Sequence, residues 1–257
     1  MNWPLADRIL RDKVAVVYGA GGPIGQAIAR GFAGHGARVH LAGRTRATLD
    51  AVADSIRADG GEVATAHVDA LDEQSVLDFV DSVADNDGAL DISVNVIGYQ
   101  DVHKPLLEIS TDEFLRPILT ATRTQFLTTR AAAPHMIRNG SGTVLTFGGT
   151  GNGMSGLGGF KIALDAVEAL RRQWAQELGE SGIRLVTLRT GGIPESLPDS
   201  LPEDERLEIT SMIDGATLLR RSATLADVGN VAAFAASDLA RSITGTEINM
   251  TCGAVLE

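Results

Sequence analysis

The sequence predicts a single α/β domain over residues 1–257, built as a doubly wound parallel sheet with helices on both faces. Short β-branched runs alternate with longer stretches of helical periodicity, which is the pattern of strands joined by crossover helices. The first run is apolar throughout, as expected of a strand that is covered on both faces. The 257 residues contain no repeat, low-complexity tract or linker, and this length suits one domain.

The first half of the chain begins with a strand at Val14–Tyr18, which ends in glycines. Pro23 suits the first turn of the following helix, because its missing N–H would be unpaired there, and Gly34 ends that helix. Asp72 is placed to cap a later helix. The other expected elements are strands at about 38–42, 62–68 and 91–96 and a helix at about 45–58.

A capping box opens the second half. Glu113 follows Ser110 by three residues, which predicts a long helix to about Ile137. Residues 191–222 are rich in proline and charge, so we interpret them as a partly helical lid on the substrate side. The other expected elements are strands at about 143–147, 183–188 and 247–251 and helices at about 155–179 and from 224 onward.

Composition narrows the classes of function. Apolar residues make up 44% and charged residues 21% of the chain, which argues against disorder. The formal net charge is −11, so the chain repels a phosphate backbone and we expect no nucleic-acid partner. The single cysteine, Cys252, cannot form an internal disulfide, which indicates a reducing compartment. The lack of cysteine clusters and histidine pairs argues against a metal site.

The chain also lacks the usual targeting and membrane signals. Met1 to Asp7 have neither a basic region nor an apolar one, unlike a secretory signal. No stretch approaches the roughly 20 apolar residues that a membrane-spanning helix needs. We therefore expect a cytoplasmic protein without a membrane partner.

A glycine-rich loop, Gly19-Ala20-Gly21-Gly22-Pro23-Ile24-Gly25, joins the first strand to the first helix. Glycines permit a tight turn and the close approach of a pyrophosphate, and the helix N-terminus supplies N–H groups and a positive dipole end. A buried strand before the loop and an amphipathic helix after it are the context of a dinucleotide site in a Rossmann fold. The alternative is a strand–helix turn that binds no ligand.

The end of the second strand bears on which dinucleotide is bound. NAD sites commonly place an acidic residue there to bind the ribose 2′-hydroxyl, but this chain reads Gly43-Arg44-Thr45-Arg46. An arginine pairs with a 2′-phosphate that an acidic residue would repel. The pattern favours NADP(H) over NAD(H), with Arg44 as the main discriminator. The alternative is that Arg44 and Arg46 only begin a solvated helix.

Over nearly its whole length the chain resembles the short-chain dehydrogenase/reductase family. The glycine loop is similar to that family's TGxxxGIG motif, residues 69–72 to its adenine-contacting DVTD segment, residues 91–98 to its DILVNNAG motif, residues 191–193 to its PGxI turn beside the nicotinamide, and residues 236–238 with 243–245 to its ASD…ITG signature. The resemblance implies cofactor contacts at Gly19, Gly21, Gly22, Ile24, Gly25, Arg44, Asp69, Asn95, Gly98, Lys161, Gly191 and Ile193.

The resemblance breaks at the catalytic residues. The family uses an asparagine, a serine and a Tyr-x-x-x-Lys pair, and only Lys161 matches. The tyrosine position is Leu157, the serine position Gly149 and the asparagine position Ala121, and the chain between 149 and 157 looks shorter than usual. Hydride transfer to a ketone makes an alkoxide, and a positioned general acid speeds that step by roughly 10²–10⁴. Leucine cannot donate a proton.

Three other side chains are candidate proton donors. Tyr99 follows the DILVNNAG-like segment and could face the nicotinamide, or it could be an aromatic side chain packed on the surface. Ser155 could be a displaced catalytic hydroxyl or a helix N-cap. His103 titrates near neutral pH but could simply be solvated. Enoyl reductases of this fold use a tyrosine seven residues before the lysine, where this chain has Met154.

Lys161 has two interpretations as well. The resemblance implies that it binds the nicotinamide ribose, a role that does not depend on a tyrosine. The alternative is an exposed helix residue. The resemblance also implies a homotetramer that packs its two long helices, at about 111–137 and 155–179, against symmetry mates. The small residues that would permit close approach are Ala131, Ala132, Ala133, Ala163 and Ala166.

The sequence therefore leaves three hypotheses about function. The first is an NADP(H)-dependent oxidoreductase with a non-standard acid–base set, acting on a small carbonyl, imine or enoyl substrate. The second is a catalytically inactive NADP(H)-binding protein that acts as a sensor or partner subunit. The third is a non-redox enzyme that reuses the fold. The first two share the nucleotide site and differ in turnover.

Overall fold

The computed structural model describes residues 8–149, 153–198 and 200–256, and the prediction about Met1 to Asp7 lies outside them. The centre of the fold is a seven-stranded sheet in the order β3-β2-β1-β4-β5-β6-β7. Every neighbouring pair of strands is parallel. The strands are β1 (Val14–Tyr18), β2 (Arg38–Gly43), β3 (Glu62–His67), β4 (Ile92–Asn95), β5 (Gly142–Gly148), β6 (Ile183–Arg189) and β7 (Thr246–Asn249). The predicted single α/β domain of Rossmann type is confirmed.

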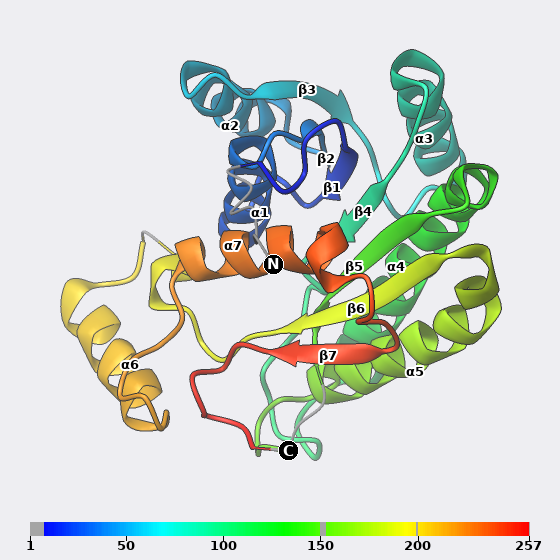
Figure 1. Ribbon diagram of the computed structural model, residues 1–257. Helices are drawn as coiled ribbons and strands as arrows, with labels where there is room; N and C mark the ends of the chain where they lie inside the picture. The colour runs from blue at the N-terminus through cyan, green and yellow to red at the C-terminus, as the bar shows by residue number, and fades with distance from the viewer. Residues whose placement is uncertain (1–7, 150–152, 199, 257) are drawn as a thin grey trace.

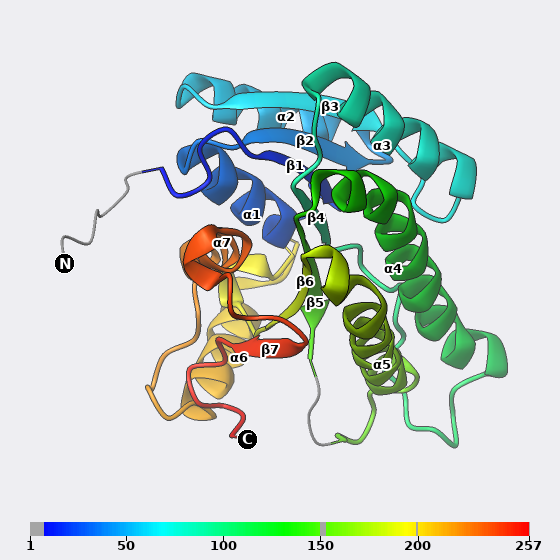
Figure 2. The ribbon, with the colours of Figure 1, turned by 45° about the vertical axis from the view of Figure 1, so that its right-hand side comes forward.

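Helices cover both faces of the sheet, with α1 and α7 on one face and α4 and α5 on the other (Figures 1 and 2). The switch in strand order lies between β1 and β4, and in such sheets ligands bind beyond the carboxyl ends of the strands at this point. The helices are α1 (Pro23–Gly34), α2 (Arg46–Ala58), α3 (Glu73–Asp87), α4 (Thr111–Asn139), α5 (Phe160–Leu178), α6 (Glu203–Gly215) and α7 (Leu225–Ala236). None of the helices formed by the described residues is both long and apolar enough to cross a bilayer.

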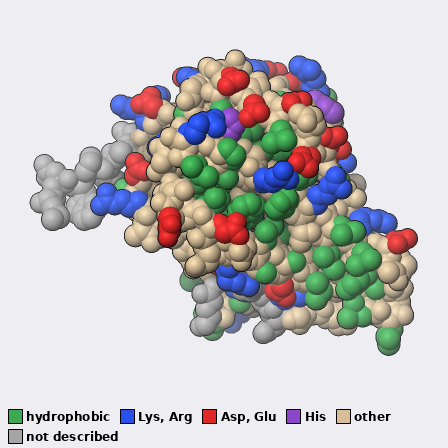
Figure 3. All heavy atoms as spheres, turned by 90° about the vertical axis from the view of Figure 1, so that its right-hand side faces the viewer, with side chains coloured by type: hydrophobic (Ala, Val, Ile, Leu, Met, Phe, Trp, Pro, Cys, Tyr) green, Lys and Arg blue, Asp and Glu red, His purple; other side chains and the backbone are tan. Residues whose placement is uncertain are grey.

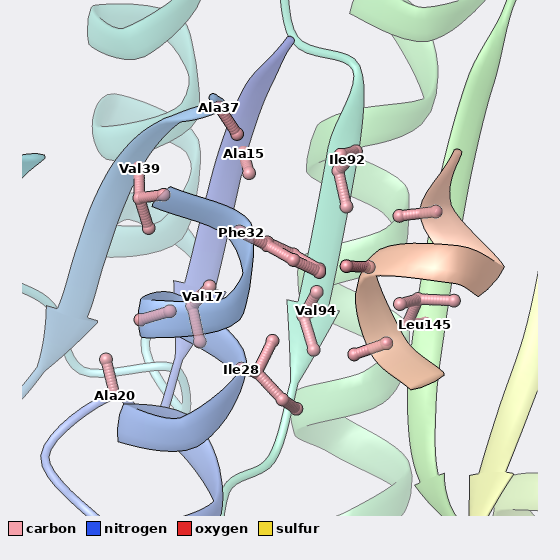
Figure 4. Packing of buried hydrophobic residues seen from close by; sticks show 14 of the residues in the cluster. Ala15, Val17, Ala20, Ile28, Phe32, Ala37, Val39, Ile92, Val94 and Leu145 are labelled. Atoms are coloured by element: carbon pink, nitrogen blue, oxygen red, sulfur yellow. The ribbon is translucent and has the colours of Figure 1, made fainter. Parts of the chain in front are cut away.

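Alternation along the central strands produces two apolar cores. Ala15 and Val17 of β1 face α1, where they pack with Ile28 and Phe32 (Figure 4). The intervening residues of the same strand face the other side and pack against α3 and α4. Because both faces of β1 are covered, all five of its residues are buried and the strand reads as one apolar run.

The helix ends follow the predicted chemistry in most places. The Ser110 hydroxyl accepts from the Glu113 N–H at 3.3 Å, and the Glu113 carboxylate accepts from the Ser110 N–H at 3.0 Å, so the capping box is present. The carboxylate of Asp72 accepts from the Ser75 N–H at 2.9 Å. Gly140 ends α4 in the left-handed conformation, which glycine adopts without steric cost.

The helix expected from Ser155 begins later, at Phe160. Gly156 and Gly158 have positive φ values of 84° and 54°, which breaks a right-handed helix, and Gly159 takes the N-cap place. The prediction of a helix start and an N-cap at Ser155 is therefore wrong. Four glycines between 153 and 159 outweighed the apolar periodicity that continues into α5.

The small residues predicted to allow contact between subunits lie inside the protomer instead. Ala131, Ala132 and Ala133 of α4 are buried in the core against the sheet. Ala163 is buried against Tyr99 and Ala121. These alanines bring α4 and α5 close to their own sheet and to each other, so their assignment to a subunit interface is wrong.

Residues 191–222 are partly helical, as expected, with a 3₁₀ turn at Pro194–Ser196 and the helix α6. A Cβ added at Gly192 would lie 2.6 Å from the Cδ1 atom of Ile213. The helix α6 therefore packs directly on the turn that follows β6.

Helices α1 and α7 cross closely because glycines meet at the crossing. A Cβ added at Gly31 would lie 2.7 Å from the carbonyl oxygen of Gly229. We expect Gly31→Ala to lower the free energy of unfolding by about 1–3 kcal/mol, because the helices must move apart. Urea denaturation measures this change. Gly34→Ala is the matched control in α1, since an added Cβ there meets nothing within 4 Å. Equal effects of the two substitutions would contradict the close crossing.

Candidate active site

Two adjoining cavities lie at the carboxyl ends of the strands. The loop cavity, about 430 Å³, is lined by the glycine loop, the residues after β2 and residues 68–71. The central cavity, about 850 Å³, is lined by the ends of β5 and β6, the start of α5 and residues 254–256. Val96, Ile97 and Gly98 line both cavities, so one extended ligand can occupy the two.

The glycine loop has the geometry of a phosphate cradle. Gly19 has a φ of 79°, and a Cβ there would lie 2.8 Å from the carbonyl oxygen of Val96. Gly21 and Gly22 also line the loop cavity. No side chain caps the N-terminus of α1, where Pro23 occupies the first turn. The backbone N–H groups at this helix end can therefore bind an anion.

Gly25 and Ile24 have different positions from the other loop residues. Gly25 is not among the described lining residues, because a Cβ there would lie 2.4 Å from the carbonyl oxygen of Gly19. Its role is to let the helix pack on the loop. Ile24 lines the central cavity.

Arg44 is the arginine that reaches the loop cavity. It lines this cavity together with Thr45, Thr48 and Asp69. The side chain of Arg46 is 76% exposed and lies 3.9 Å from the carboxylate of Asp50. The carboxylate of Asp69 accepts from the Leu71 N–H at 3.0 Å, which fixes the turn at this wall of the cavity.

Asn95 is buried and supports the wall between the cavities from behind. Its side-chain amide donates to the Thr128 hydroxyl at 3.2 Å, and its side-chain oxygen accepts from the Ile97 N–H at 3.1 Å. Gln125 donates to the Asn95 carbonyl oxygen at 3.3 Å. Asn95 therefore positions the backbone that leads to Gly98 and is not among the described lining residues of either cavity.

Lys161 lies in the first turn of α5 and lines the central cavity. Its ammonium group contacts the carboxylate of Asp165, one helical turn later. The side chain of Lys161 is 16% exposed. A largely sheltered cation at this wall can donate hydrogen bonds to hydroxyl groups of a bound ligand.

Tyr99 is not a surface aromatic residue. It is 6% exposed, lines the central cavity and packs with Ala121 and Ala163. Its ring centroid lies 6.2 Å from that of Phe160. The Tyr99 hydroxyl donates to the Phe147 carbonyl oxygen at 3.1 Å, and burial raises the pKa of Tyr99 to about 12. Both features make it a weak proton donor near neutral pH.

The other predicted site residues are divided between the cavity and its surroundings. Ser155 is exposed and is not among the described lining residues, whereas its neighbours Met154 and Leu157 line the central cavity. Gly191 lines this cavity, but Ile193 is buried in the core beside α1 and α7. The His103 side chain is 60% exposed and its ring lies 2.8 Å from the carboxylate of Asp101.

The sequence analysis missed Arg189, the last residue of β6. The side chain of Arg189 is 6% exposed, lines the central cavity and lies 3.2 Å from the carboxylate of Glu247. A Cβ added at Gly149 would lie 2.5 Å from the Cγ atom of Arg189. The arginine stem therefore fills the space that a side chain at position 149 would need. A charged residue that ends an otherwise apolar strand, directly before Thr190-Gly191, was the signal in the sequence.

A buried polar network continues beneath the central cavity. Glu168 is fully buried, accepts from the Thr187 hydroxyl and pairs with the Arg171 guanidinium at 2.7 Å. Burial raises the pKa of the Glu168 carboxyl, and the nearby Glu247 carboxylate adds to this rise. The network joins α5 to β6 and approaches Arg189 through Glu247.

The central cavity is otherwise mainly apolar. Its described ionisable lining residues are Tyr99, Asp101, Lys161 and Arg189. Asn249 donates to the Val255 carbonyl oxygen at 3.0 Å, which holds residues 254–256 against the cavity. Within residues 8–149, 153–198 and 200–256, no three His, Cys, Asp or Glu side chains cluster as metal ligands would.

Comparisons with known proteins agree on the type of enzyme that the chain resembles. A family described as enoyl-(acyl carrier protein) reductase matches residues 19–254. The uncharacterised oxidoreductase YxbG of Bacillus subtilis is 31% identical over 95% of this chain and 91% of its own length. Meso-2,3-butanediol dehydrogenase of Serratia marcescens is 30% identical over 95% of this chain and 94% of its own length.

Solved structures give the same result. A 7α-hydroxysteroid dehydrogenase in complex with NADH and 7-oxo glycochenodeoxycholic acid superimposes with a TM-score of 0.87 at 28% identity, covering 98% of both chains. An NAD⁺-bound xylitol dehydrogenase has a TM-score of 0.85 at 25% identity, covering 95% of this chain and 99% of its own. Both neighbours hold a nicotinamide cofactor.

The state of Tyr99 can be read in an alkaline titration, because the chain has only two tyrosines, Tyr18 and Tyr99. Burial raises the pKa of both. We expect the folded protein to show almost no tyrosinate absorbance at a pH of about 10, where a free tyrosine is half ionised. Since the folded state favours the neutral phenol, stability should fall as the pH rises above that value. A tyrosinate band with a midpoint below pH 9 that disappears in Tyr99→Phe would instead make Tyr99 an activated acid.

Proposed function

Because this chain belongs to the short-chain dehydrogenase/reductase family, we propose that it is an NADP(H)-dependent oxidoreductase with a non-standard acid–base set. Its substrate is a small carbonyl, imine or enoyl compound. The observation that supports this proposal best is the pair of cavities that meet at residues 96–98, one walled by the glycine loop and the other by Lys161. The cofactor, when bound, supplies or accepts the hydride.

The residues around the loop cavity are suited to hold the cofactor. The N–H groups of Gly21 and Gly22 and the N-terminus of α1 bind the pyrophosphate, and Asp69 lies at the adenine side. Lys161 binds the nicotinamide ribose. Two solved relatives carry NAD(H), so the proposed preference for NADP(H) rests on Arg44 and the lack of an acidic side chain at residues 43–46.

The acid–base set determines which acceptors suffer least. Leu157 and Gly149 offer no proton donor, and Tyr99 gives its hydroxyl proton to the Phe147 carbonyl oxygen. Ser155 enters the catalytic set only if its exposed turn moves toward the central cavity. A carbon–nitrogen or conjugated carbon–carbon double bond needs no strong acid at an oxygen atom during hydride transfer. We therefore propose these acceptors over simple ketones.

An alternative is an inactive NADP(H)-binding protein that acts as a sensor or partner subunit. The observation that favours it is that Arg189 fills the space of the missing serine side chain, so the loss is built into the packing. This alternative shares the cofactor site and differs only in the absence of turnover with every acceptor.

We also propose a cytoplasmic homotetramer. Its support is the outer face of α4 and α5, where Leu119, Phe126 and Ile162 are 62%, 39% and 48% exposed. Hydrophobic side chains gather on this side of the molecule (Figure 3). The Phe126 ring stacks on Trp174 with centroids 5.8 Å apart, which joins the two helices in one apolar surface. Large exposed apolar surfaces of this kind mark protein contacts.

Arg44→Asp tests the cofactor preference. We expect the wild-type chain to bind NADPH at least about tenfold more tightly than NADH, and the variant to reverse that order, because a carboxylate repels the 2′-phosphate and accepts from the 2′-hydroxyl. Fluorescence titration of the reduced nicotinamide measures both affinities. Arg46→Asp makes the same charge change two residues away on an exposed side chain and should keep the wild-type order. Equal affinities for both cofactors before and after Arg44→Asp would disprove the assignment.

Matched acceptors test the missing proton donor. We expect NADPH oxidation with 2-cyclohexen-1-one or a cyclic imine to exceed that with cyclohexanone by about 10²-fold, the lower part of the range for one general acid. The absorbance of NADPH follows the reaction. Rapid reduction of cyclohexanone that is unaffected by Tyr99→Phe and Ser155→Ala would show that another donor exists. NADPH binding without turnover of any acceptor would favour the inactive alternative.

A further inference from the structure

We propose that Arg189 binds the substrate oxygen from the space that the family's serine side chain would occupy, and that this site therefore selects α,β-unsaturated carbonyl compounds over iminium ions. The inference rests on the proposed function and narrows its substrate class. Arg189 acts as a hydrogen-bond donor to the oxyanion that develops during hydride transfer.

The first support is the exchange of space between two strands. In the sheet, Gly148 of β5 lies opposite Arg189 of β6. The Cβ that position 149 lacks would lie 2.5, 2.7 and 2.9 Å from the Cγ, Cδ and Cβ atoms of Arg189. Gly149 also has a φ of 122°, which other residues rarely adopt. The two positions thus form one unit in which the polar group comes from the neighbouring strand.

The second support is how the guanidinium is held. Its Nη1 atom donates to the Glu247 carboxylate at 3.2 Å, and the Glu247 side chain is only 11% exposed. Arg189 lines the central cavity, whereas Glu247 is not among its described lining residues. The ion pair is therefore a dipole with its positive end toward the cavity. A guanidinium held by a carboxylate on one side is preorganised to donate in a fixed direction.

The third support is the surrounding charge. Glu168 lies beneath this pair and is itself matched by Arg171 at 2.7 Å. On the cavity wall, the Lys161 ammonium contacts Asp165, and the carboxylate of Asp101 lies 2.8 Å from the ring of His103. The walls between these groups are apolar. In such a setting an oriented donor stabilises a developing negative charge more strongly than in water.

The chemistry that fits this donor is conjugate reduction. The β-carbon of an enoyl substrate receives hydride from the reduced nicotinamide, the C=C electron pair moves to the carbonyl, and the oxygen becomes an enolate that Arg189 stabilises. A proton from solvent then adds to the α-carbon, which gives the saturated carbonyl compound. The sum is enoyl compound plus NADPH plus one proton giving saturated product plus NADP⁺. No acid strong enough to protonate an alkoxide is required.

The same donor works against an iminium substrate. An iminium carbon carries positive charge before hydride transfer and loses it afterwards, so the positive end of the Arg189–Glu247 pair repels the reactant. A guanidinium also has no acceptor lone pair for the iminium N–H. The cavity therefore separates the two acceptor classes that the missing tyrosine leaves open.

The oxyanion site can be tested without turnover by binding 4-nitrophenol in the presence of NADP⁺. The phenol ionises near neutral pH and its phenolate is coloured, so its pKa reports the stabilisation of an oxyanion. We expect the wild-type complex to raise the ionisation constant of the bound phenol about tenfold, a fall of one pKa unit. Arg189→Met should abolish this shift, and Arg189→Lys should retain part of it.

Buried variants need matched controls for folding. Arg189→Met combined with Glu247→Gln avoids an unpaired buried carboxylate and should abolish the shift as the single variant does. Arg171→Met combined with Glu168→Gln removes the other buried ion pair and should leave the shift unchanged. Failure of the phenol to bind, equal phenol pKa values in wild type and Arg189→Met, or an equal effect of the Arg171 variant would each overturn the proposal.

An activity measurement then tests the substrate class. We expect Arg189→Met to slow reduction of 2-cyclohexen-1-one by about 10²–10³-fold, as when an oxyanion donor is removed, and to leave reduction of 2-methyl-1-pyrroline within a few-fold. Equal losses for both acceptors would overturn the proposed selectivity. Failure of the chain to bind NADPH would defeat the proposed function, whereas NADPH binding without a phenol shift would defeat only the role of Arg189.

Discussion

The register of β5 against β6 is the constraint on which the central cavity depends. It places Gly148 opposite Arg189 and so brings a long charged side chain to the end of the strand that leads into Gly149. The arginine fits because position 149 has no Cβ, and the glycine is tolerated because the arginine stem fills the gap. Neither residue can change alone without a clash or a void. The departures from the family pattern therefore belong to one rearranged site rather than to independent losses.

Burying this arginine sets a demand that the rest of the sheet meets. A buried charge costs stability unless a partner and further hydrogen bonds compensate for lost water. Glu247 on β7 provides the partner, and the pair Glu168–Arg171 lies next to it on α5. These contacts tie the cavity floor to β6, β7 and α5. The substrate side thus has a fixed polar floor, while its upper walls are apolar and come from separate loops.

The sequence predicted the fold well because its signals are local. The apolar run at Val14–Tyr18, the capping box at Ser110 and the glycine loop each depend on neighbouring residues, and each is present in the structure. The start of α5 was misplaced because glycines after Ser155 override helical periodicity. The relationship between Gly149 and Arg189 was out of reach, since it joins residues that are close only through strand pairing.

Side-chain direction was the other limit. Position in a motif suggested that Asn95 contacts the cofactor, but its side chain supports the backbone of Ile97 from the buried side. Tyr99 stands next to the same motif and turns inward to the carbonyl oxygen of Phe147. Loop residues of this kind follow the packing of α4 and α5, which a single sequence does not encode in any spacing.

The most direct measurement of this account is a crystal structure of the chain with NADP⁺ and 4-nitrophenol bound. We predict the 2′-phosphate at Arg44, the nicotinamide between Gly98 and Lys161, and the phenolate oxygen within hydrogen-bond distance of the Arg189 guanidinium. A cofactor in the loop cavity with the phenolate oxygen bound by another group, or with Arg189 turned away from the central cavity, would contradict the account.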